Sequence, residues 1–194
     1  MIPAALLACA PNIAPITLEA VIRVESGGNP LAIHVNRLRA QPTPATNAAA
    51  AAQIAEGYIL HGYSVDLGLM QVNSRNLVAL GTTVEHVLDP CTNVRNGAAI
   101  LTADYAEAAR TRGEGQVALQ AALSAYNTGS FYRGFANGYL ARYYGPGGVP
   151  ALAGGVREAA ATAGAMKHTA PPPTNPYTAD TSVFVREASN VRVE

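Results

Sequence analysis

The chain has 194 residues, of which 49% are hydrophobic and 13% charged, and its thirteen basic residues are matched by thirteen acidic ones. This charge balance gives no reason to expect nucleic acid or an anionic surface as a partner. No apolar run approaches the roughly 20 residues that a membrane-spanning helix needs. A chain of this length favours one domain followed by a tail.

The first ten residues are the nearest candidate for an export signal. Residues 2–10 are mostly apolar, but the run is short and lacks the basic residues that begin a secretory signal. We therefore interpret residues 1–10 as a signal remnant or a plain N-terminal segment before the domain.

The first predicted helix ends on an acidic residue. Pro15 and Thr17 indicate its start, with Thr17 as the cap, and the two glycines after Ser26 indicate its end. Glu25 lies seven residues after Leu18, on the same apolar stripe. Burial there and the negative end of the helix would both raise the pKa of the carboxyl group, as a general acid requires. The alternative is a rotated helix in which Glu25 is an ordinary exposed residue.

The next stretch predicts a second helix and then a bent, strand-like segment. Residues 45–60 form an alanine-rich helix with an apolar face. Residues 62–73 alternate like a strand that Gly68 interrupts, which is typical of a bulge that carries polar groups inward. A further helix is expected at residues 74–80.

Helix-start signals recur in the second half of the chain. Thr82 with Glu85 matches a capping box for a short helix. Asp89 before Pro90 predicts another helix, which should end by Gly113. Two more helices are expected, at residues 116–125 and 135–144, with a turn at residues 126–129 after the first of them.

The character of the chain changes after residue 145, where glycine and proline become frequent. We place the folded domain at residues 11–145 and a Gly/Pro-rich tail, partly disordered, at residues 146–194. The tail has a possible helix at 156–166 and a proline run at 171–173. Its segment 182–185 is either a short binding element or plain disorder, and disorder is favoured.

The cysteines allow two interpretations, and the histidines do not indicate a metal site. Cys9 and Cys91 are either two buried thiols or one disulfide, which would indicate an oxidising compartment. The four histidines lack the i, i+4 pairing of a helical zinc site. We expect no metal and no other cofactor.

Three separated stretches carry polar residues that a helical domain does not need for its core. They are Glu25-Ser26, the run Gly68-Leu-Met-Gln71, and Ala125-Tyr-Asn127. In this order they resemble the signature of the lysozyme-like superfamily, in particular the lytic transglycosylases. The resemblance implies a mainly α, lysozyme-like fold of the goose-type or soluble lytic transglycosylase kind, with a short irregular or β-like segment around residues 63–73.

Further matches are similar to the small transglycosylases that accompany type IV secretion and conjugation systems. The shared features are the Cys9-Ala-Pro11 start, the run from Glu25 to Ile33, the run from Asp66 to Arg75, and Asp89-Pro-Cys91. The resemblance covers roughly residues 9–144 and leaves out the tail. Between Pro30 and Ser64 the chain departs from the larger transglycosylases, so their substrate contacts in that region are not carried over.

The resemblance implies a catalytic role for Glu25 and a candidate role for Asp66. Cleaving a β-1,4 bond between sugars needs a proton for the leaving oxygen and stabilisation of an oxocarbenium-like transition state. Glu25 would supply the proton and then act as the base. Asp66 matches the second catalytic carboxylate of animal-type lysozymes and would steady the positive charge or position the acetamido group. The alternative is a structural acid that holds the bent segment.

The same resemblance suggests residues that contact the glycan. Gln71, Tyr126 and Asn127 are candidates for hydrogen bonds to acetamido and hydroxyl groups, and Tyr126 could also orient Glu25. Met70 would pack on a sugar face or on Glu25, or else fill the core, as methionine commonly does. Ser26 is a candidate substrate ligand but is better explained as a helix-end hydrogen-bonding residue.

The sequence therefore predicts a periplasmic lytic transglycosylase that cleaves peptidoglycan between N-acetylmuramic acid and N-acetylglucosamine. Its partners would be glycan strands and, through the tail, components of a secretion or conjugation apparatus. Two alternatives remain. One is a true lysozyme, a hydrolase that uses Glu25 and Asp66. The other is a non-catalytic assembly factor that binds glycan.

Overall fold

The computed structural model describes residues 2–144, which form two compact units. The first contains the residues up to Ala10 together with Val21–Ala99, and we call it the sheet unit. The second contains Pro11–Ala20 and the described residues from Ile100 onward, and we call it the helical unit. The expected mainly α fold with a short β-like segment is confirmed. The tail predicted from residue 146 onward, with its helix and its binding element, lies outside the described residues.

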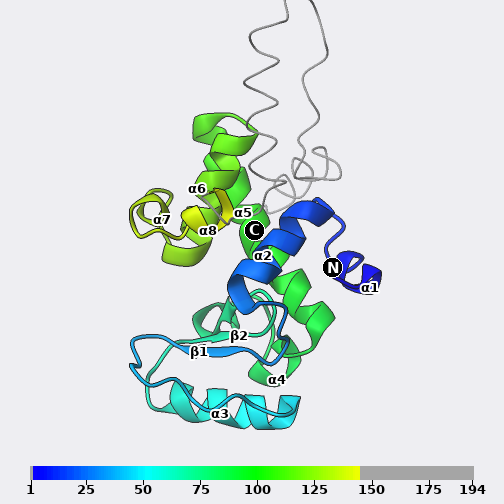
Figure 1. Ribbon diagram of the computed structural model, residues 1–194, viewed down its shortest axis with the longest axis vertical. Coiled ribbons are helices and arrows are strands. Elements are labelled where there is room, and N and C mark those ends of the chain that lie inside the picture. The colour runs from blue at the N-terminus through cyan, green and yellow to red at the C-terminus, as the bar shows by residue number, and fades with distance from the viewer. Residues whose placement is uncertain (1, 145–194) are drawn as a thin grey trace, which may run out of the picture. The chain divides into compact units, whose positions relative to one another are not determined.

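The sheet unit is built around a small antiparallel sheet in the order β1-β2-β3. The helix α3 packs against β1 and β2 (Figure 1). Two helices, α2 (Pro15–Ser26) and α5 (Pro90–Arg112), contribute residues to both units. The remaining elements of the sheet unit are α1 (Ala4–Leu7), β1 (Ile33–Val35), α3 (Ala48–Leu60), β2 (Val65–Leu67), β3 (Val72–Asn73), the 3-10 helix η1 (Ser74–Asn76) and α4 (Val84–Val87).

Strand alternation determines which side chains of the sheet are buried. Val35, Val65 and Leu67 are fully buried, whereas Asp66, between two of them, is half-buried. Successive side chains of a strand point to opposite faces, so Asp66 faces away from the core side of β2. The register pairs Asp66 with His34 of β1 and with Asn73 of β3.

The helical unit contains α6 (Gln116–Thr128), α7 (Arg133–Ala136) and α8 (Ala141–Tyr144), and α6 packs against α7. The contact depends on Gly134, where an added Cβ would lie 2.7 Å from the Cα of Ser124. The backbone N–H of Gly134 donates to Ser124 Oγ at 2.8 Å, and this hydroxyl donates to the carbonyl of Ser130 at 2.6 Å. The buried Ser124 therefore helps to fix the connection from α6 to α7.

Two predicted helix caps are wrong, one by three residues and the other by one. The helix α2 begins at Pro15, so Thr17 lies inside it and is buried rather than capping it. The cap of α4 is Thr83, whose hydroxyl accepts from the N–H of His86 at 3.3 Å, and not Thr82. A cap needs extended backbone angles, which two adjacent threonines do not distinguish by sequence.

The helix predicted at residues 45–60 begins later, at Ala48, because Asn47 caps it by accepting from the N–H of Ala50 at 2.9 Å. The start of α5 is confirmed. Asp89 caps it by accepting from the N–H of Thr92 at 2.8 Å, and the helix ends at Arg112, before Gly113 as expected.

Three other predicted helices differ from the observed ones. Instead of a helix over 74–80, only the short η1 forms. The helix α6 does not stop at residue 125 but continues through Thr128 and ends at Gly129, whose φ is 66°. In place of one helix over 135–144 there are two short ones, separated where Gly138 has a φ of 81°.

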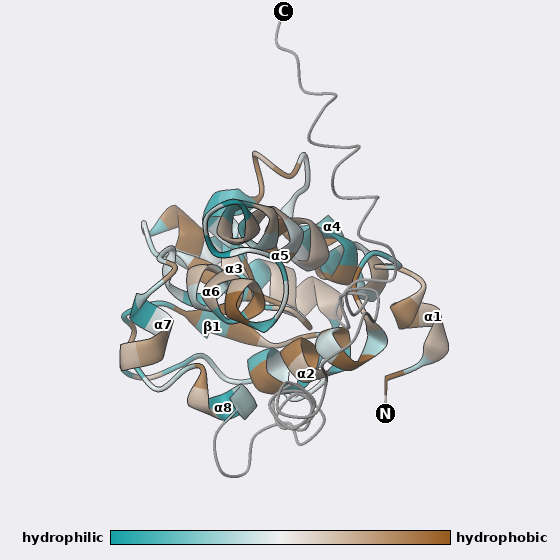
Figure 2. Ribbon diagram, turned by 90° about the horizontal axis from the view of Figure 1, so that it is seen from above, coloured by the Kyte–Doolittle hydropathy of each residue, from teal (hydrophilic) through white to brown (hydrophobic). Residues whose placement is uncertain are grey.

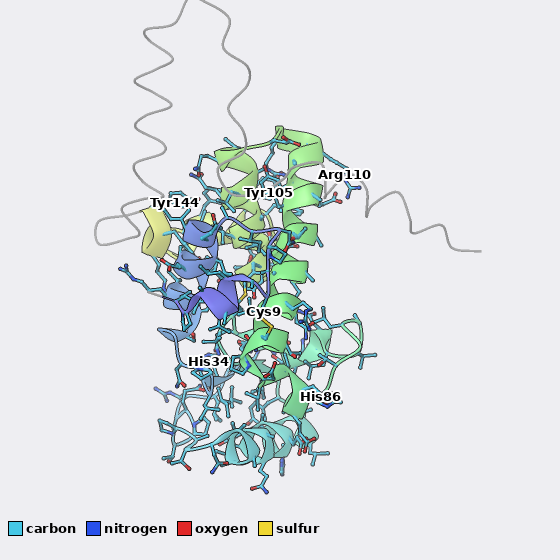
Figure 3. The ribbon with its side chains drawn as sticks, turned by 90° about the vertical axis from the view of Figure 1, so that its right-hand side faces the viewer. Cys9, His34, His86, Tyr105, Arg110 and Tyr144 are labelled. Atoms are coloured by element: carbon cyan, nitrogen blue, oxygen red, sulfur yellow. A yellow bond between two sulfur atoms is a disulfide. The ribbon has the colours of Figure 1, made fainter. Side chains whose placement is uncertain are left out.

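The two cysteines form a disulfide within the sheet unit. It joins Cys9, shortly after α1, to Cys91, in the first turn of α5, across 82 residues of sequence (Figure 3). Of the two possibilities that the sequence left open, the structure has the disulfide. The segment before α2 is therefore covalently tied to the sheet unit.

None of the helices in the described part of the chain is both long and apolar enough to cross a membrane.

Asp104, on α5, provides a prediction on the pH dependence of stability. Burial raises the pKa of this half-buried carboxyl to about 6, so the folded state binds its proton more tightly than the unfolded state does. The stability contributed by protonated Asp104, relative to the ionised form, is fully present below the unfolded pKa of about 4 and is lost as the pH rises through about 6. The full shift corresponds to about 3 kcal/mol, which solvent screening reduces to about 1 kcal/mol for a partly exposed group. Urea unfolding should therefore find Asp104→Asn more stable than the wild type by that amount at pH 7.5, and equal to it at pH 4.

Asp89 is the matched control, since its pKa is shifted in the opposite direction. Hydrogen bonds from the start of α5, above all that from Thr92, lower the pKa of Asp89. Its contribution is present at neutral pH and is lost as the pH falls through the lowered pKa. Asp89→Asn should therefore lose stability at pH 7.5 and little in strong acid. Equal pH profiles for the two variants would contradict the assignment.

Candidate functional site

Glu25 lies in the last turn of α2 (Pro15–Ser26), in its sheet-unit part. Six of its twelve residues are apolar, and the helix is brown along part of its length (Figure 2). Val21 and Ile22, one turn before Glu25, are buried, whereas Glu25 itself is half-buried. The predicted stripe is thus present, and its last member reaches partial solvent exposure. Gly27 and Gly28 follow with φ values of 64° and 86°, left-handed angles that end the helix here.

Ser26 links the end of α2 to the turn that follows β2. Its Oγ lies 2.8 Å from the carbonyl oxygen of Leu69 and 3.1 Å from that of Ile22, and it accepts from the N–H of Gly28 at 3.2 Å. A hydroxyl has one proton, so the two carbonyls share it. The neighbour of Glu25 is thereby held against the Gly68–Gln71 segment, and this helix-end role is the one that sequence analysis favoured for Ser26.

The Gly68–Gln71 segment is a tight turn with two residues in left-handed geometry. Gly68 has a φ of 72°, and Gln71, which is not a glycine, has a φ of 48°. The Gln71 side chain stabilises this geometry, because its Nε2 donates to the carbonyl of Gly68 at 2.9 Å and to that of Ala32 at 3.3 Å. Strained backbone of this kind concentrates at functional sites.

Met70 and Gln71 differ in what they can offer a ligand. The Met70 side chain is completely buried, which fits the core role left open for it. Gln71 is half-buried, and its amide nitrogen is used within the turn. The acceptor oxygen of Gln71 is therefore the part suited to a substrate N–H or hydroxyl.

Two asparagines hold the carboxylate of Asp66. Asn36 Nδ2 donates to its Oδ2 at 2.8 Å, and Asn73 Nδ2 donates to its Oδ1 at 2.5 Å. Asn36 follows β1 and Asn73 belongs to β3, so residues from both neighbouring strands bind the carboxylate on the central strand. This arrangement fixes the orientation of the group.

The protonation of Asp66 reflects opposing influences. Burial raises its pKa, whereas the hydrogen bonds from Asn36 and Asn73 and the nearby His34 lower it, and the net direction is upward. A held carboxyl group with a raised pKa is compatible both with a structural role and with one in catalysis.

The other two predicted ligands lie in the helical unit. Tyr126 and Asn127 belong to the last turn of α6, not to a turn after it. Tyr126 is half-buried, and Asn127 is exposed, with its Oδ1 accepting from Asn137 Nδ2 at 3.3 Å. Across residues 2–144, no group of three or more His, Cys, Asp or Glu residues could hold a metal ion.

Comparison with protein families matches residues 4–141 to the transglycosylase SLT domain. The chain belongs to this family. The match includes every candidate site residue of both units, and the lysozyme-like fold expected from the three motifs is confirmed.

Two proteins named virB1 are similar to this chain. The chain is 44% identical to protein virB1 of Agrobacterium fabrum over 132 residues, which are 68% of this chain and 53% of that protein. It is 42% identical to the type IV secretion system protein virB1 of Brucella abortus biovar 1 over 140 residues, 70% of this chain and 58% of that protein. The chain thus spans little more than half the length of these relatives. No solved structure matches it.

Three asparagines that hold residues of the site are not predicted from the sequence. Asn36 and Asn73 bind Asp66, and Asn93 of α5 binds the turn after β2. A signal existed only for Asn93, which lies four and eight residues before the buried Gly97 and Leu101 on α5. A polar residue on an apolar stripe needs partners, because an unsatisfied buried amide is costly.

Proposed function

We propose that this chain is a peptidoglycan lytic transglycosylase acting in the periplasm. It would cleave the β-1,4 bond between N-acetylmuramic acid and N-acetylglucosamine and open the wall for a type IV secretion or conjugation apparatus. Membership of the transglycosylase SLT family and the virB1 names of its relatives support this proposal. The observation that carries it is the hydrogen bond from Ser26 to Leu69, which ties the Glu25 end of α2 to the turn bearing Gln71.

The proposed reaction uses Glu25 twice. The protonated carboxyl gives its proton to the glycosidic oxygen as the bond from this oxygen to C1 of the muramic residue breaks. The 6-hydroxyl of the same residue then attacks C1 and closes a 1,6-anhydro ring, and its proton passes to the Glu25 carboxylate. No water is consumed, so one carboxyl group suffices. Gln71, Tyr126 and Asn127 are the proposed hydrogen-bonding contacts to the glycan.

The second candidate is a true lysozyme, and the geometry of Asp66 is the observation in its favour. Asn36 and Asn73 orient this carboxylate, as a second catalytic acid would require. A hydrolase would direct water to C1 and leave a reducing sugar. In the transglycosylase, Asp66 would steady the positive charge or position the acetamido group.

Mass analysis of the products distinguishes the two candidates. Purified peptidoglycan digested by the wild-type protein should release fragments that end in 1,6-anhydro-muramic acid, each lighter by one water than the hydrolytic product. A known lysozyme acting on the same wall preparation provides the hydrolytic control. Reducing ends without the anhydro ring would remove the transglycosylase assignment in favour of the hydrolase.

A further inference from the structure

Asn93 of α5 binds the backbone on both sides of the turn after β2. Its Oδ1 accepts from the N–H of Met70 at 2.8 Å. Its Nδ2 donates to the carbonyl of Leu67 at 2.8 Å and to that of Val87 at 2.8 Å. The side chain is 1% exposed, so these bonds form away from water, where they are strongest and where their loss costs most.

Gly68 lets this amide approach the turn. An added Cβ at Gly68 would lie 2.3 Å from Nδ2 of Asn93 and 2.8 Å from its Cγ, distances that no side chain tolerates. The φ of 72° at the same residue also favours glycine. Asn93 and Gly68 are therefore matched, since the amide occupies the space that a side chain at residue 68 would need.

Ser26 of α2 binds the same turn. Asn93 binds at Leu67 and Met70, and Ser26 binds at Leu69 between them. Two side chains from α2 and α5 thus determine the course of four consecutive residues. Ser26, which follows Glu25 in the chain, thus connects the catalytic end of α2 to this turn. Gln71 follows Met70 directly.

We propose that Asn93 is a positioning residue of the transglycosylase site. From α5 it holds the Leu67–Met70 backbone, which keeps Gln71 in its catalytic position. Through Ser26, the same backbone keeps the Glu25 end of α2 in place. An apolar side chain would fill this buried position without the cost of desolvating an amide. The inference rests on the proposed function, and it adds a residue that touches neither substrate nor the reacting atoms.

Asn93→Asp tests the proposal with an almost unchanged side-chain shape. A carboxyl group still accepts from Met70, but it can donate to only one carbonyl when protonated and to neither when ionised, so the turn should shift. Because displaced catalytic groups lose transition-state stabilisation, kcat should fall about 30-fold at pH 7.5 on soluble glycan strands, with kcat/KM falling in parallel.

The matched control is Asn96→Asp, one turn further along α5. Asn96 is half-buried, and its Nδ2 has no hydrogen-bond partner among the described residues. The control receives the same chemical change without touching the turn, so its kcat should stay within about twofold of wild type. All rates are measured at a temperature at which circular dichroism shows each variant to be fully folded.

Ser26→Ala is the second variant, and it decides the matter if Asn93→Asp does not fold. It removes the other tether from a partly exposed helix end, and kcat should fall about tenfold. Ser26→Thr keeps the hydroxyl and should restore most of the rate.

The outcomes separate the two proposals. A wild type that releases no anhydro product removes the proposed function, and this inference with it. An active wild type with Asn93→Asp at the rate of Asn96→Asp overturns the positioning role alone. If Asn93→Asp is unfolded, Ser26→Ala at the wild-type rate overturns it.

Discussion

Glu25→Gln is expected to lower the release of anhydro-muropeptides from purified peptidoglycan by at least about a thousandfold, since the amide can neither donate the proton nor act as the base. The fold should be retained, because glutamine has the shape of glutamate and Glu25 is only half-buried. Product release is measured by chromatography with mass detection, and folding by circular dichroism and thermal unfolding.

Glu19→Gln is the control, because it removes a carboxylate from the same helix six residues before Glu25. Its activity should stay within about twofold of wild type. Wall cleavage that persists in Glu25→Gln would exclude the proposed role. If Glu25→Gln loses cleavage but still supports secretion in cells, the non-catalytic assembly role, and not enzymatic opening of the wall, is the biological one.

Asp66→Asn, in the same assay, tests whether Glu25 works alone. A transglycosylase needs one essential carboxyl group, so this variant should lose much less activity than Glu25→Gln. The hydrolase alternative predicts comparable losses for both variants. Because Asn36 and Asn73 both donate to Asp66, the substituted amide is a poorer partner, and the stability of this variant must be measured beside its rate.

The double variant Cys9→Ser/Cys91→Ser is expected to lose about 4.5 kcal/mol of unfolding free energy at 25 °C, the loop-closure value for a bridge across 82 residues. Domains of this size are commonly stable by about 5–15 kcal/mol, so the loss is a large fraction of the total. The bridge acts mainly by restricting the unfolded chain. Urea unfolding of protein produced in an oxidising compartment measures the difference.

Reduction provides the control for the disulfide. Wild-type protein treated with dithiothreitol should unfold at the same urea concentration as the double variant, whereas the double variant should not respond to the reductant. Thiol titration of the unfolded, unreduced wild type should find no free thiol. Two titratable thiols would refute the bridge, and an unchanged midpoint in the double variant would refute its stabilising role.

Local sequence signals predicted the helices that depend on periodicity and on strong boundary residues. The stripe of α2, the Asp89-Pro90 start of α5 and its end before Gly113 all follow from the sequence. Boundaries were wrong where neighbouring residues have equal propensity, as at Thr82 and Thr83. They were also wrong at residues 126–129, because Tyr126 and Asn127 prolong α6 before Gly129 ends it.

Some residues of the candidate site were predictable from the sequence and others were not. Glu25, Asp66 and Gln71 were named because their residue types and order match a family signature, and that signature is a property of sequence. Asn36 and Asn93 were not named, because each contacts its partner only after distant segments pack together. Asn73 was not named because the antiparallel pairing of β2 and β3 brings it back to Asp66, seven residues earlier. Asn93, for example, binds Met70 across 23 residues of sequence.

By itself, the sequence determined the family, the mainly helical fold and the acidic end of α2, because periodicity and motif order are local properties of the chain. The tertiary structure decided how that end is held. It showed that Ser26 and Asn93 bind one turn from two helices, that Asp66 lies between two amides, and that Cys9 reaches Cys91. Apart from the pair Asp66 and Asn73, these contacts join residues that are distant in sequence, and only folding brings their side chains within reach of one another.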